Sequence, residues 1–418
     1  MKLATLVSLF PIAWSAMASP LAAADAAPIR PGDRVAIVGN TFADQLRIHG
    51  YLETLLLQHS EDDPILIRNL GWGGDMLTAR DRPTGFPSEE STLAAHRTDV
   101  IIACFGMGES FAGEAGIDGF KRDLADFIAS HQGKRYNGET EVRLVLVSPI
   151  ACENLGRLTP THERRNGELE AYTRAMAGVA QATKVPFVDL FETTRYLMEE
   201  SEGPSLTTNG IHLNPFGYWA IGRILFDNLV ADGEGGKASQ PWELRIDAKS
   251  GDGSGRGVEI GVLDRKAGRL RFEVEEKTGP TPPPPTGEAL PAQLGDHRDT
   301  LVVTNLQPGN YTLSIDGEST VTANHEAWAQ GVPVDASPAH RMVEDLRAAI
   351  NDKNLQFTYG WKALNQVHIV GERRKSPSGQ ALPAEVVEFD RLAKQREAEL
   401  PDLIERKIRI WQLTPAEG

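Results

Sequence analysis

Short apolar runs alternate with amphipathic stretches along the first half of the chain. Between the runs, apolar residues recur every three or four positions, as over 42–56, 120–130 and 167–183, which is the spacing of one helix face. Strands that are apolar throughout and separated by helices indicate a parallel sheet that is covered on both faces. We therefore expect residues 28–232 to form a doubly wound α/β domain with its site at the carboxyl ends of the strands. The runs that predict a five-stranded parallel sheet are Val35–Val38, Ile65–Ile67, Val100–Phe105, Val142–Val147 and Phe187–Leu190.

The pattern changes after the glycine-rich segment 231–236, which we interpret as a linker. Residues 238–335 contain short runs of β-type residues, a hairpin turn signal at Asp316-Gly317 and a proline-rich excursion over 279–285. We expect a small β-sandwich with a Pro-rich loop in this region. The expected strands are Trp242–Ile246, Val258–Val262, Leu270–Val274, Leu301–Thr304 and Tyr311–Ile315.

Helical spacing returns near Ala339, and a charged stretch over 385–407 predicts a further helix. We expect residues 336–418 to be a helical C-terminal segment that packs on the other domains. Within it, the stretch 357–368 combines aromatic residues, amides and a histidine. Such a stretch could line a sugar site, but we favour interdomain packing anchored by Trp361.

The first residues predict export. Lys2 precedes an apolar stretch over 3–17, and small residues follow as far as Ala24, so we expect residues 1–24 to be a cleaved signal peptide. The mature chain would then be periplasmic or extracellular. The apolar stretch is interrupted by Pro11, and no later segment predicts a membrane span.

Composition narrows the function classes. Hydrophobic residues make up 40% and charged residues 24% of 418 residues, which is typical of a globular chain of more than one domain. A net charge of −15 disfavours nucleic acid as a partner. Cys104 and Cys152 are too few for a disulfide framework, and both a single bridge and two buried thiols stay open. The chain contains no His-Glu-x-x-His or Cys-x-x-Cys spacing, so we expect neither a metal nor another cofactor.

His212 lies in the segment Asn-Gly-Ile-His-Leu-Asn-Pro over 209–215. Asn214 is a favourable N-cap and Pro215 a favourable first helical residue, so a helix should begin there. His212 would then lie on the turn before this helix, where it could act as a general base near neutral pH. From position alone, the alternative is a histidine that only hydrogen-bonds a loop carbonyl.

Thr41 stands where the first strand meets the first helix, so its hydroxyl would face the same edge as His212. Thr41 is also a favourable N-cap, and Asp44 completes a Thr-x-x-Asp capping pattern, so a purely structural role stays open. Glycines follow the next two strands, and glycine lets backbone N–H groups approach a developing oxyanion. These glycines are Gly71, Gly73, Gly74, Gly106 and Gly108.

In this order and spacing, the four segments resemble the sequence blocks of the SGNH (GDSL-type) hydrolase superfamily over roughly residues 34–230. Members of that superfamily have flavodoxin-like α/β folds and cleave ester bonds, often of acetylated sugars or lipids. The resemblance implies that Thr41 is at the nucleophile position, Gly74 is a backbone oxyanion donor and His212 is the base. Gly108 falls on the side-chain oxyanion donor, and Asn209 falls on the residue that orients the base.

Three of these positions depart from the superfamily pattern. Thr41 replaces serine and adds a methyl group that restricts its rotamers. Asn209 replaces aspartate, and in a serine protease the corresponding change lowers turnover by about 10⁴. Gly108 replaces asparagine and provides no side-chain N–H, a loss that typically costs about 10²–10³ in turnover.

Two carboxylates could compensate. Glu109 and Asp75 would lie near the same edge, where either could orient His212 or activate water. The alternative for Glu109 is that it only accepts hydrogen bonds from loop N–H groups. An amide that orients the base, as in Cys-His-Asn sites, is a further possibility for Asn209.

Two hypotheses follow. The first is an exported ester hydrolase that acts on a small-molecule or glycan ester, such as acylated carbohydrate, with His212 as base and Thr41 as nucleophile. The second is a catalytically degenerate SGNH fold that binds a glycan or an acyl group.

Overall fold

A computed structural model of the chain describes residues 27–82, 86–200, 203–230, 241–266, 268–285, 290, 294, 297–363 and 375–416. The predicted signal peptide at 1–24 and the predicted linker at 231–236 lie outside the described residues.

The first half of the chain forms the predicted parallel sheet, with the strand order β2-β1-β3-β4-β5. Every neighbouring pair in it is parallel, and in the central strand β3 all positions are buried. The prediction of a doubly wound α/β fold is therefore confirmed. The strands are β1 Arg34–Gly39, β2 Leu66–Asn69, β3 Val100–Cys104, β4 Arg143–Val147 and β5 Phe187–Val188.

Helices cover both faces of this sheet. Side chains of α1, α2, α6 and α7 share one core with alternate strand residues, and side chains of α3, α4 and α5 share the other. The stripe over 42–56 is split into two helices at Gly50, whose φ of 68° is left-handed and therefore ends α1. The helices are α1 Thr41–His49, α2 Tyr51–His59, α3 Glu89–His96, α4 Ile117–His131, α5 His162–Thr183, α6 Leu190–Glu200 and α7 Pro215–Val230, with 3₁₀ turns at Glu109–Ala112, Glu114–Gly116 and Gly156–Leu158.

The second half contains the expected β-sandwich. One sheet has the order β13-β10-β6-β7 and the other β12-β11-β14-β9-β8, and Trp242, Phe272, Trp328 and Trp411 are fully buried between them. The predicted hairpin turn joins β11 to β12, with Asp316 and Gly317 both at positive φ. The elements are β6 Glu243–Asp247, β7 Gly253–Arg256, β8 Val258–Lys266, β9 Arg269–Glu276, β10 Thr300–Thr304, β11 Asn310–Ile315, β12 Glu318–Asn324, α8 His325–Gln330, β13 Val332–Pro333 and β14 Ile408–Pro415.

The prediction that residues 336–418 form a wholly helical segment is wrong, because this segment ends in a strand. Its last strand, β14, lies inside the sandwich between β9 and β11. Buried Arg409, Trp411 and Leu413 alternate with less buried neighbours in β14, which is the period of a strand. The helices before it are therefore an insertion between two strands of the sandwich: α9 Pro338–Ala363 and α11 Pro377–Glu399, followed by a 3₁₀ turn at Pro401–Leu403.

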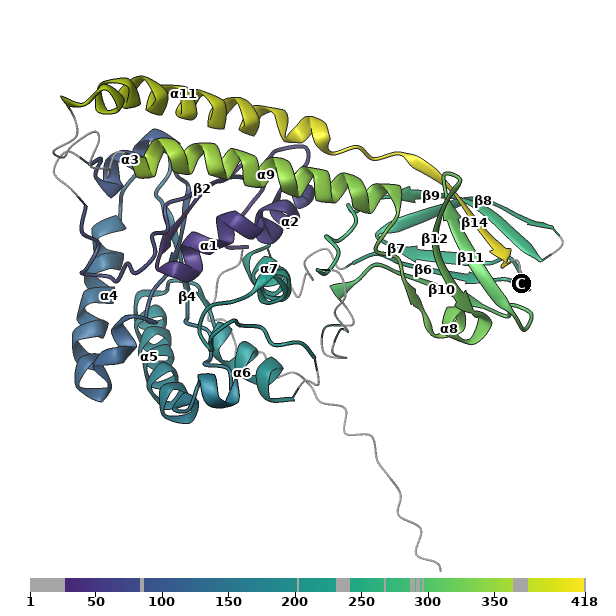
Figure 1. The fold of residues 1–418 in the computed structure, drawn as a ribbon, viewed down its shortest axis with the longest axis horizontal. Coiled ribbons are helices and arrows are strands. Elements are labelled where there is room, and N and C mark those ends of the chain that lie inside the picture. Colours follow the sequence, from purple (N-terminus) through teal and green to yellow (C-terminus); the bar gives the residue numbers. More distant parts are fainter. Residues whose placement is uncertain are drawn as a thin grey trace, which may run out of the picture.

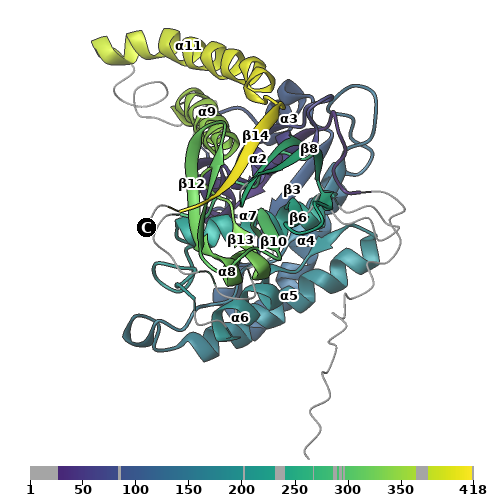
Figure 2. The same ribbon diagram turned by 90° about the vertical axis from the view of Figure 1, so that its right-hand side faces the viewer.

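The inserted helices α9 and α11 form an arm that returns from the sandwich to the α/β domain. The two helices lie side by side, and α9 runs over α1 and α2 (Figure 1). Figure 2 shows both helices on the same side of the molecule. Among the described residues, none of the helices has the length and apolar character needed to cross a bilayer.

Candidate active site

Thr41 is the first residue of α1, but it does not cap that helix. The N-cap is Asn40, whose extended backbone lets its Oδ1 accept a hydrogen bond from Phe42 N at 3.0 Å. The capping alternative for Thr41 is therefore wrong, because the preceding residue fills that role. Asp44, the other half of the expected pattern, pairs instead with Arg47 at 2.8 Å and Lys362 at 2.7 Å.

The Thr41 hydroxyl faces the loop that follows β2. Gly74 N–H donates a hydrogen bond to Thr41 Oγ1 at 3.3 Å, so the structure brings these two predicted site residues together. The loop approaches α1 closely, since a Cβ on Gly71 would lie 2.5 Å from Asp44 N. Gly74 has a φ of 86°, a left-handed conformation that favours glycine.

His212 lies before α7, as predicted. Asn214 caps that helix by accepting a hydrogen bond from Gly217 N at 2.8 Å, and Pro215 is its first residue. Within the part of the chain that the structure describes, the His212 ring bonds no loop carbonyl; its Nδ1 lies 2.9 Å from Asn209 Nδ2. Asn209 Oδ1 accepts from the backbone N–H groups of Ile211 at 3.3 Å and His212 at 3.0 Å.

These contacts fix which form of neutral His212 is present. Because Asn209 Oδ1 faces two backbone donors, the amide group that faces the ring is Nδ2, which can only donate. His212 Nδ1 must therefore accept, and the ring proton resides on Nε2. A general base needs the opposite tautomer, with a free lone pair on Nε2.

The two halves of the candidate site are not directly bonded. Among the described residues, no hydrogen bond joins Thr41 to His212: the Thr41 hydroxyl bonds Gly74 N–H, and the His212 ring bonds Asn209. Transfer of a proton from the Thr41 hydroxyl to the His212 ring requires the two groups to come within hydrogen-bond reach or to be joined by one water.

The two carboxylates that could compensate, Glu109 and Asp75, bind groups other than His212 in the described part of the chain. Glu109 accepts hydrogen bonds from Leu77 N at 2.9 Å and Gly106 N at 2.8 Å, which matches the alternative of a loop-holding role. Asp75 forms a bidentate pair with Arg82 at 3.0 and 2.7 Å. Burial raises the pKa of both carboxyls, and neither hydrogen-bonds His212 within the described part of the chain. The proposal that one of them orients the base is therefore not supported by their contacts.

Gly108, the predicted side-chain donor position, is covered by the Met76 side chain, which would have to move for a larger residue to fit. A Cβ there would lie 2.7 Å from Met76 Cγ and 2.9 Å from Met76 Sδ. The Met76 side chain thus fills the space into which an asparagine would project. The backbone at Gly108 is right-handed, so a side chain at this position would cause no backbone strain.

Glu153 was missed by the sequence analysis. Its buried carboxylate accepts hydrogen bonds from Leu206 N at 2.9 Å and Thr207 N at 2.7 Å, and its own N–H donates to Gly210 O at 2.9 Å. These bonds hold the segment that carries Asn209 and His212. No sequence signal marked Glu153, because it follows β4 and meets the His212 segment only in the folded chain.

The cysteine question is also decided. Cys104 and Cys152 are both free and buried. Burial raises the pKa of the Cys104 thiol to about 12, so this thiol stays protonated.

The aromatic stretch 357–368 is described as far as residue 363. In this part Trp361 packs against Trp72 and Phe86 of the α/β domain, which agrees with the interdomain packing that we favoured. Residues 364–368 lie outside the described part.

Residues 32–220 match the model of the GDSL-like Lipase/Acylhydrolase family. The α/β domain belongs to this family. The match confirms the resemblance to the SGNH superfamily and supports ester hydrolysis as the class of reaction. No curated protein matches the chain.

The chain is similar to several solved structures. A gut microbial diltiazem-metabolizing enzyme is 14% identical, with 94% of this chain and 99% of that chain covered and a TM-score of 0.67. This likeness shows a common fold over nearly the whole chain, sandwich and arm included. An acetylxylan esterase from Geobacillus stearothermophilus is 16% identical, with 48% of this chain and 96% of that chain covered and a TM-score of 0.38. Another acetyl xylan esterase is 18% identical, with coverages of 46% and 97% and a TM-score of 0.35.

Proposed function

We propose that this protein is an exported ester hydrolase in which Thr41 is the nucleophile and His212 the general base. The observation that carries the proposal is the 3.3 Å hydrogen bond from Gly74 N–H to Thr41 Oγ1 at the carboxyl edge of the sheet. A backbone donor aimed at this point can stabilise the oxyanion that forms when a hydroxyl attacks an ester carbonyl.

The reaction would proceed in two acyl transfers. Thr41 Oγ1 attacks the carbonyl carbon while His212 Nε2 accepts the hydroxyl proton, and the carbonyl oxygen gains negative charge beside Gly74 N–H. The alcohol then leaves with the proton from His212. Water attacks the acyl-threonine by the same route, which releases the acid and restores the hydroxyl.

The base step requires a rearrangement of Asn209. For Nε2 to carry the lone pair, the Nδ1 proton must face an acceptor, so the amide has to turn its oxygen toward the ring. That turn sacrifices the hydrogen bonds from Ile211 N and His212 N. We therefore expect slow turnover compared with a site that has a carboxylate at this position.

The substrate class that the family resemblance implies is a small-molecule or glycan ester, with acylated carbohydrate as our first candidate. Export is proposed from the sequence of residues 1–24. The Thr41 methyl group crowds the nucleophilic oxygen, and a small acyl group such as acetyl is therefore our first candidate.

The direct test compares hydrolysis of 4-nitrophenyl acetate and acetylated xylan by the wild type, Thr41→Ala and His212→Ala. Thr78→Ala, a nearby exposed threonine, is the matched control. We expect both site variants to fall to the background rate and the control to match the wild type. Equal rates for all four proteins would refute the proposal.

The second candidate function is binding without turnover. It is favoured by the Asn209 amide nitrogen that faces His212 and by the Met76 side chain that fills the donor position. Binding of acylated and deacylated oligosaccharides to the full chain, measured by calorimetry, separates the two. Tight binding of an ester that is not consumed would favour this function, and consumption of the ester would exclude it.

A further inference from the structure

The arm of α9 and α11 is fixed to the α/β domain by buried polar contacts. The Lys353 ammonium, which is fully buried, contacts the Glu53 carboxylate of α2 and donates to Ile67 O at 3.0 Å. Asn354 Nδ2 donates to Glu53 Oε2 at 2.8 Å, and Arg68 of β2 pairs with Glu397 of α11. Because a buried charge without its partner is strongly unfavourable, these pairs specify where the arm docks.

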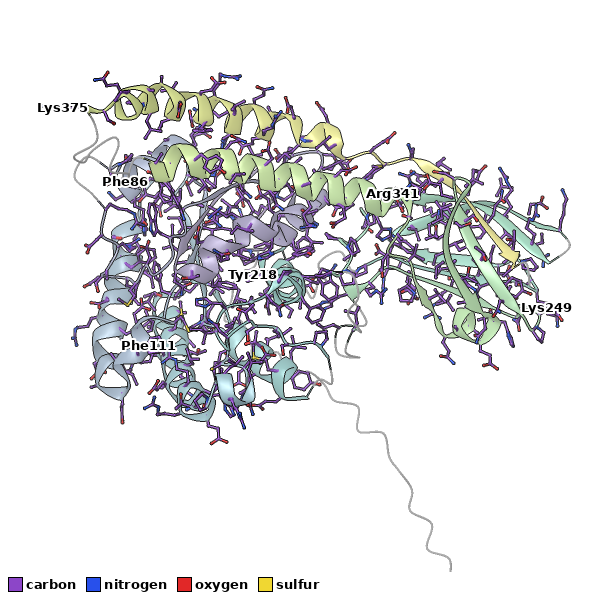
Figure 3. All side chains as sticks on the ribbon, viewed as in Figure 1. Phe86, Phe111, Tyr218, Lys249, Arg341 and Lys375 are labelled. Atoms are coloured by element: carbon purple, nitrogen blue, oxygen red, sulfur yellow. The ribbon has the colours of Figure 1, made fainter. Side chains whose placement is uncertain are left out.

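The last turns of α9 reach the loop that carries Gly74. The Trp361 ring packs edge-on against Trp72 at 5.5 Å and against Phe86 at 5.5 Å, and it stacks on Phe357 at 5.8 Å. Phe86, labelled in Figure 3, lies beside the end of α9 that is farthest from the sandwich. These contacts place an aromatic cluster directly against the residue that precedes Gly73 and Gly74.

Trp72 is the anchor of this loop. Its backbone N–H donates a hydrogen bond to Gly39 O at 2.9 Å, and its backbone carbonyl accepts one from Asp75 N at 3.0 Å. Gly73 and Gly74 are both exposed, and glycine loses more conformational freedom on ordering than other residues. The direction of the Gly74 N–H therefore depends on how firmly Trp72 is held.

Lys362 joins the same turn of α9 to the helix of the nucleophile. Its Nζ lies 2.7 Å from Asp44 Oδ1 and 4.8 Å from the centre of the Trp72 ring. Asp44 is in the first turn of α1, which begins at Thr41. One turn of the arm thus contacts both elements that meet in the Gly74–Thr41 hydrogen bond.

We propose that Trp361 and Lys362 are positioning residues that hold the Gly74 loop against the first turn of α1. The inference rests on the proposed function, and it assigns the arm a part in the reaction although the arm belongs to the sandwich by topology. Neither residue touches the reacting atoms. They act through Trp72 and Asp44 on the separation and direction of the oxyanion donor.

The expected signature is a loss of kcat with little change in KM. Misplacement of a catalytic group by about 1 Å can lower the rate by about 10²-fold, so we expect Trp361→Ala to lower kcat by about 10- to 10²-fold. Trp361→Phe should restore most of the rate, because it keeps an aromatic ring against Trp72. Lys362→Met should lower kcat less, and Lys362→Arg should restore it.

Tyr359→Ala is the matched control. Tyr359 is on the same part of α9, is 47% exposed and packs on Phe389 of α11 instead of on Trp72. This variant should keep the wild-type kcat. Thermal unfolding of each variant shows whether the arm and the domain remain folded.

Hydrogen exchange of the backbone amides over residues 70–77 gives a readout that does not depend on activity. We expect faster exchange in Trp361→Ala than in Tyr359→Ala, and wild-type exchange in Trp361→Phe. Unchanged exchange and kcat in Trp361→Ala would overturn the inference. If Thr41→Ala were fully active, the proposed function would fail, while the exchange experiment would still decide whether the arm orders the Gly74 loop.

Discussion

Asn209 presents its amide nitrogen to the His212 ring, because two backbone N–H groups occupy its oxygen. A carboxylate at the same position would not face this conflict. One of its oxygens could accept the hydrogen bonds from the two backbone N–H groups while the other accepted a hydrogen bond from Nδ1–H. The identity of a single side-chain atom therefore separates a ring that is held ready to accept the Thr41 proton from one that must first exchange its tautomer.

This argument predicts that Asn209→Asp increases ester hydrolysis. The change should raise kcat by about 10²- to 10⁴-fold, the upper value being the effect of the reverse change in a serine protease. The measurement is steady-state hydrolysis of 4-nitrophenyl acetate at neutral pH. Asn209→Asp combined with His212→Ala is the control and should show no gain, and a gain that survives loss of His212 would contradict the argument.

At the scale of elements, β14 ties the end of the chain to the middle of the sandwich. Trp411 is fully buried, and its ring packs against Trp242 at 5.5 Å and Phe272 at 5.9 Å. Because β14 lies between β9 and β11, a fragment that stops near Val334 lacks an inner strand. The sandwich should therefore be studied in the full chain.

Trp411→Ala tests how much β14 contributes to the stability of the sandwich. We expect a loss of about 3–5 kcal/mol in the free energy of unfolding, because a large aromatic side chain leaves a cavity between the two sheets. Urea unfolding followed by circular dichroism measures it. Gln412→Ala, the neighbour that faces the other side of the sheet, should change stability by less than about 1 kcal/mol. Similar losses in both variants would show that the side of the sheet does not matter.

At the scale of the whole molecule, a buried polar network lies where the sandwich meets the arm. His340 Nδ1 lies 2.7 Å from Ser337 Oγ, and its Nε2 lies 3.0 Å from Asp299 Oδ2. This order of groups is that of a serine hydrolase triad, but all three residues are at most 1% exposed, so no substrate can reach them. Asp299 also accepts hydrogen bonds from Trp242 N and Thr281 N, so the network joins segments of the sandwich to α9.

Glu276, at the end of β9, makes this junction sensitive to pH. Burial raises the pKa of its carboxyl from 4.5 to about 7, although His340, Arg409 and Arg406 oppose the shift and Asp299 adds to it. Below pH 4.5 the Glu276 carboxyl is protonated in both the folded and the unfolded chain, so it does not lower the free energy of unfolding. As pH rises from 4.5 to 7, the unfolded chain releases this proton and the folded chain retains it, so stability falls.

We therefore expect Glu276→Gln to remove this loss. The difference in unfolding free energy between the variant and the wild type should grow between pH 4.5 and 7, by at most about 3 kcal/mol at about 1.36 kcal/mol per pH unit, and then level off. Urea unfolding at several pH values measures it. Glu275→Gln, on the more exposed side of β9, is the control, and a constant difference across this range would contradict the raised pKa.

Local patterns in the sequence were sufficient for several features. Apolar runs predicted the parallel sheet, Asp316-Gly317 predicted the hairpin between β11 and β12 of the sandwich, and Asn214-Pro215 predicted the start of α7. Each depends on the conformational preferences of neighbouring residues, which the sequence displays directly. In β14, buried and less buried residues alternate equally regularly. The prediction nevertheless assigns its eight residues to the helical segment, because they follow long helical patterns.

Only the tertiary structure decided the candidate site. Segments far apart in the chain had to be brought together before Gly74 could be seen to face Thr41, Glu153 to hold the His212 segment, Met76 to fill the space at Gly108, or Lys362 to reach Asp44. The sequence determined which groups could accept or donate protons. Folding determined which partners each group has, because hydrogen bonding and packing depend on distances that no local pattern contains.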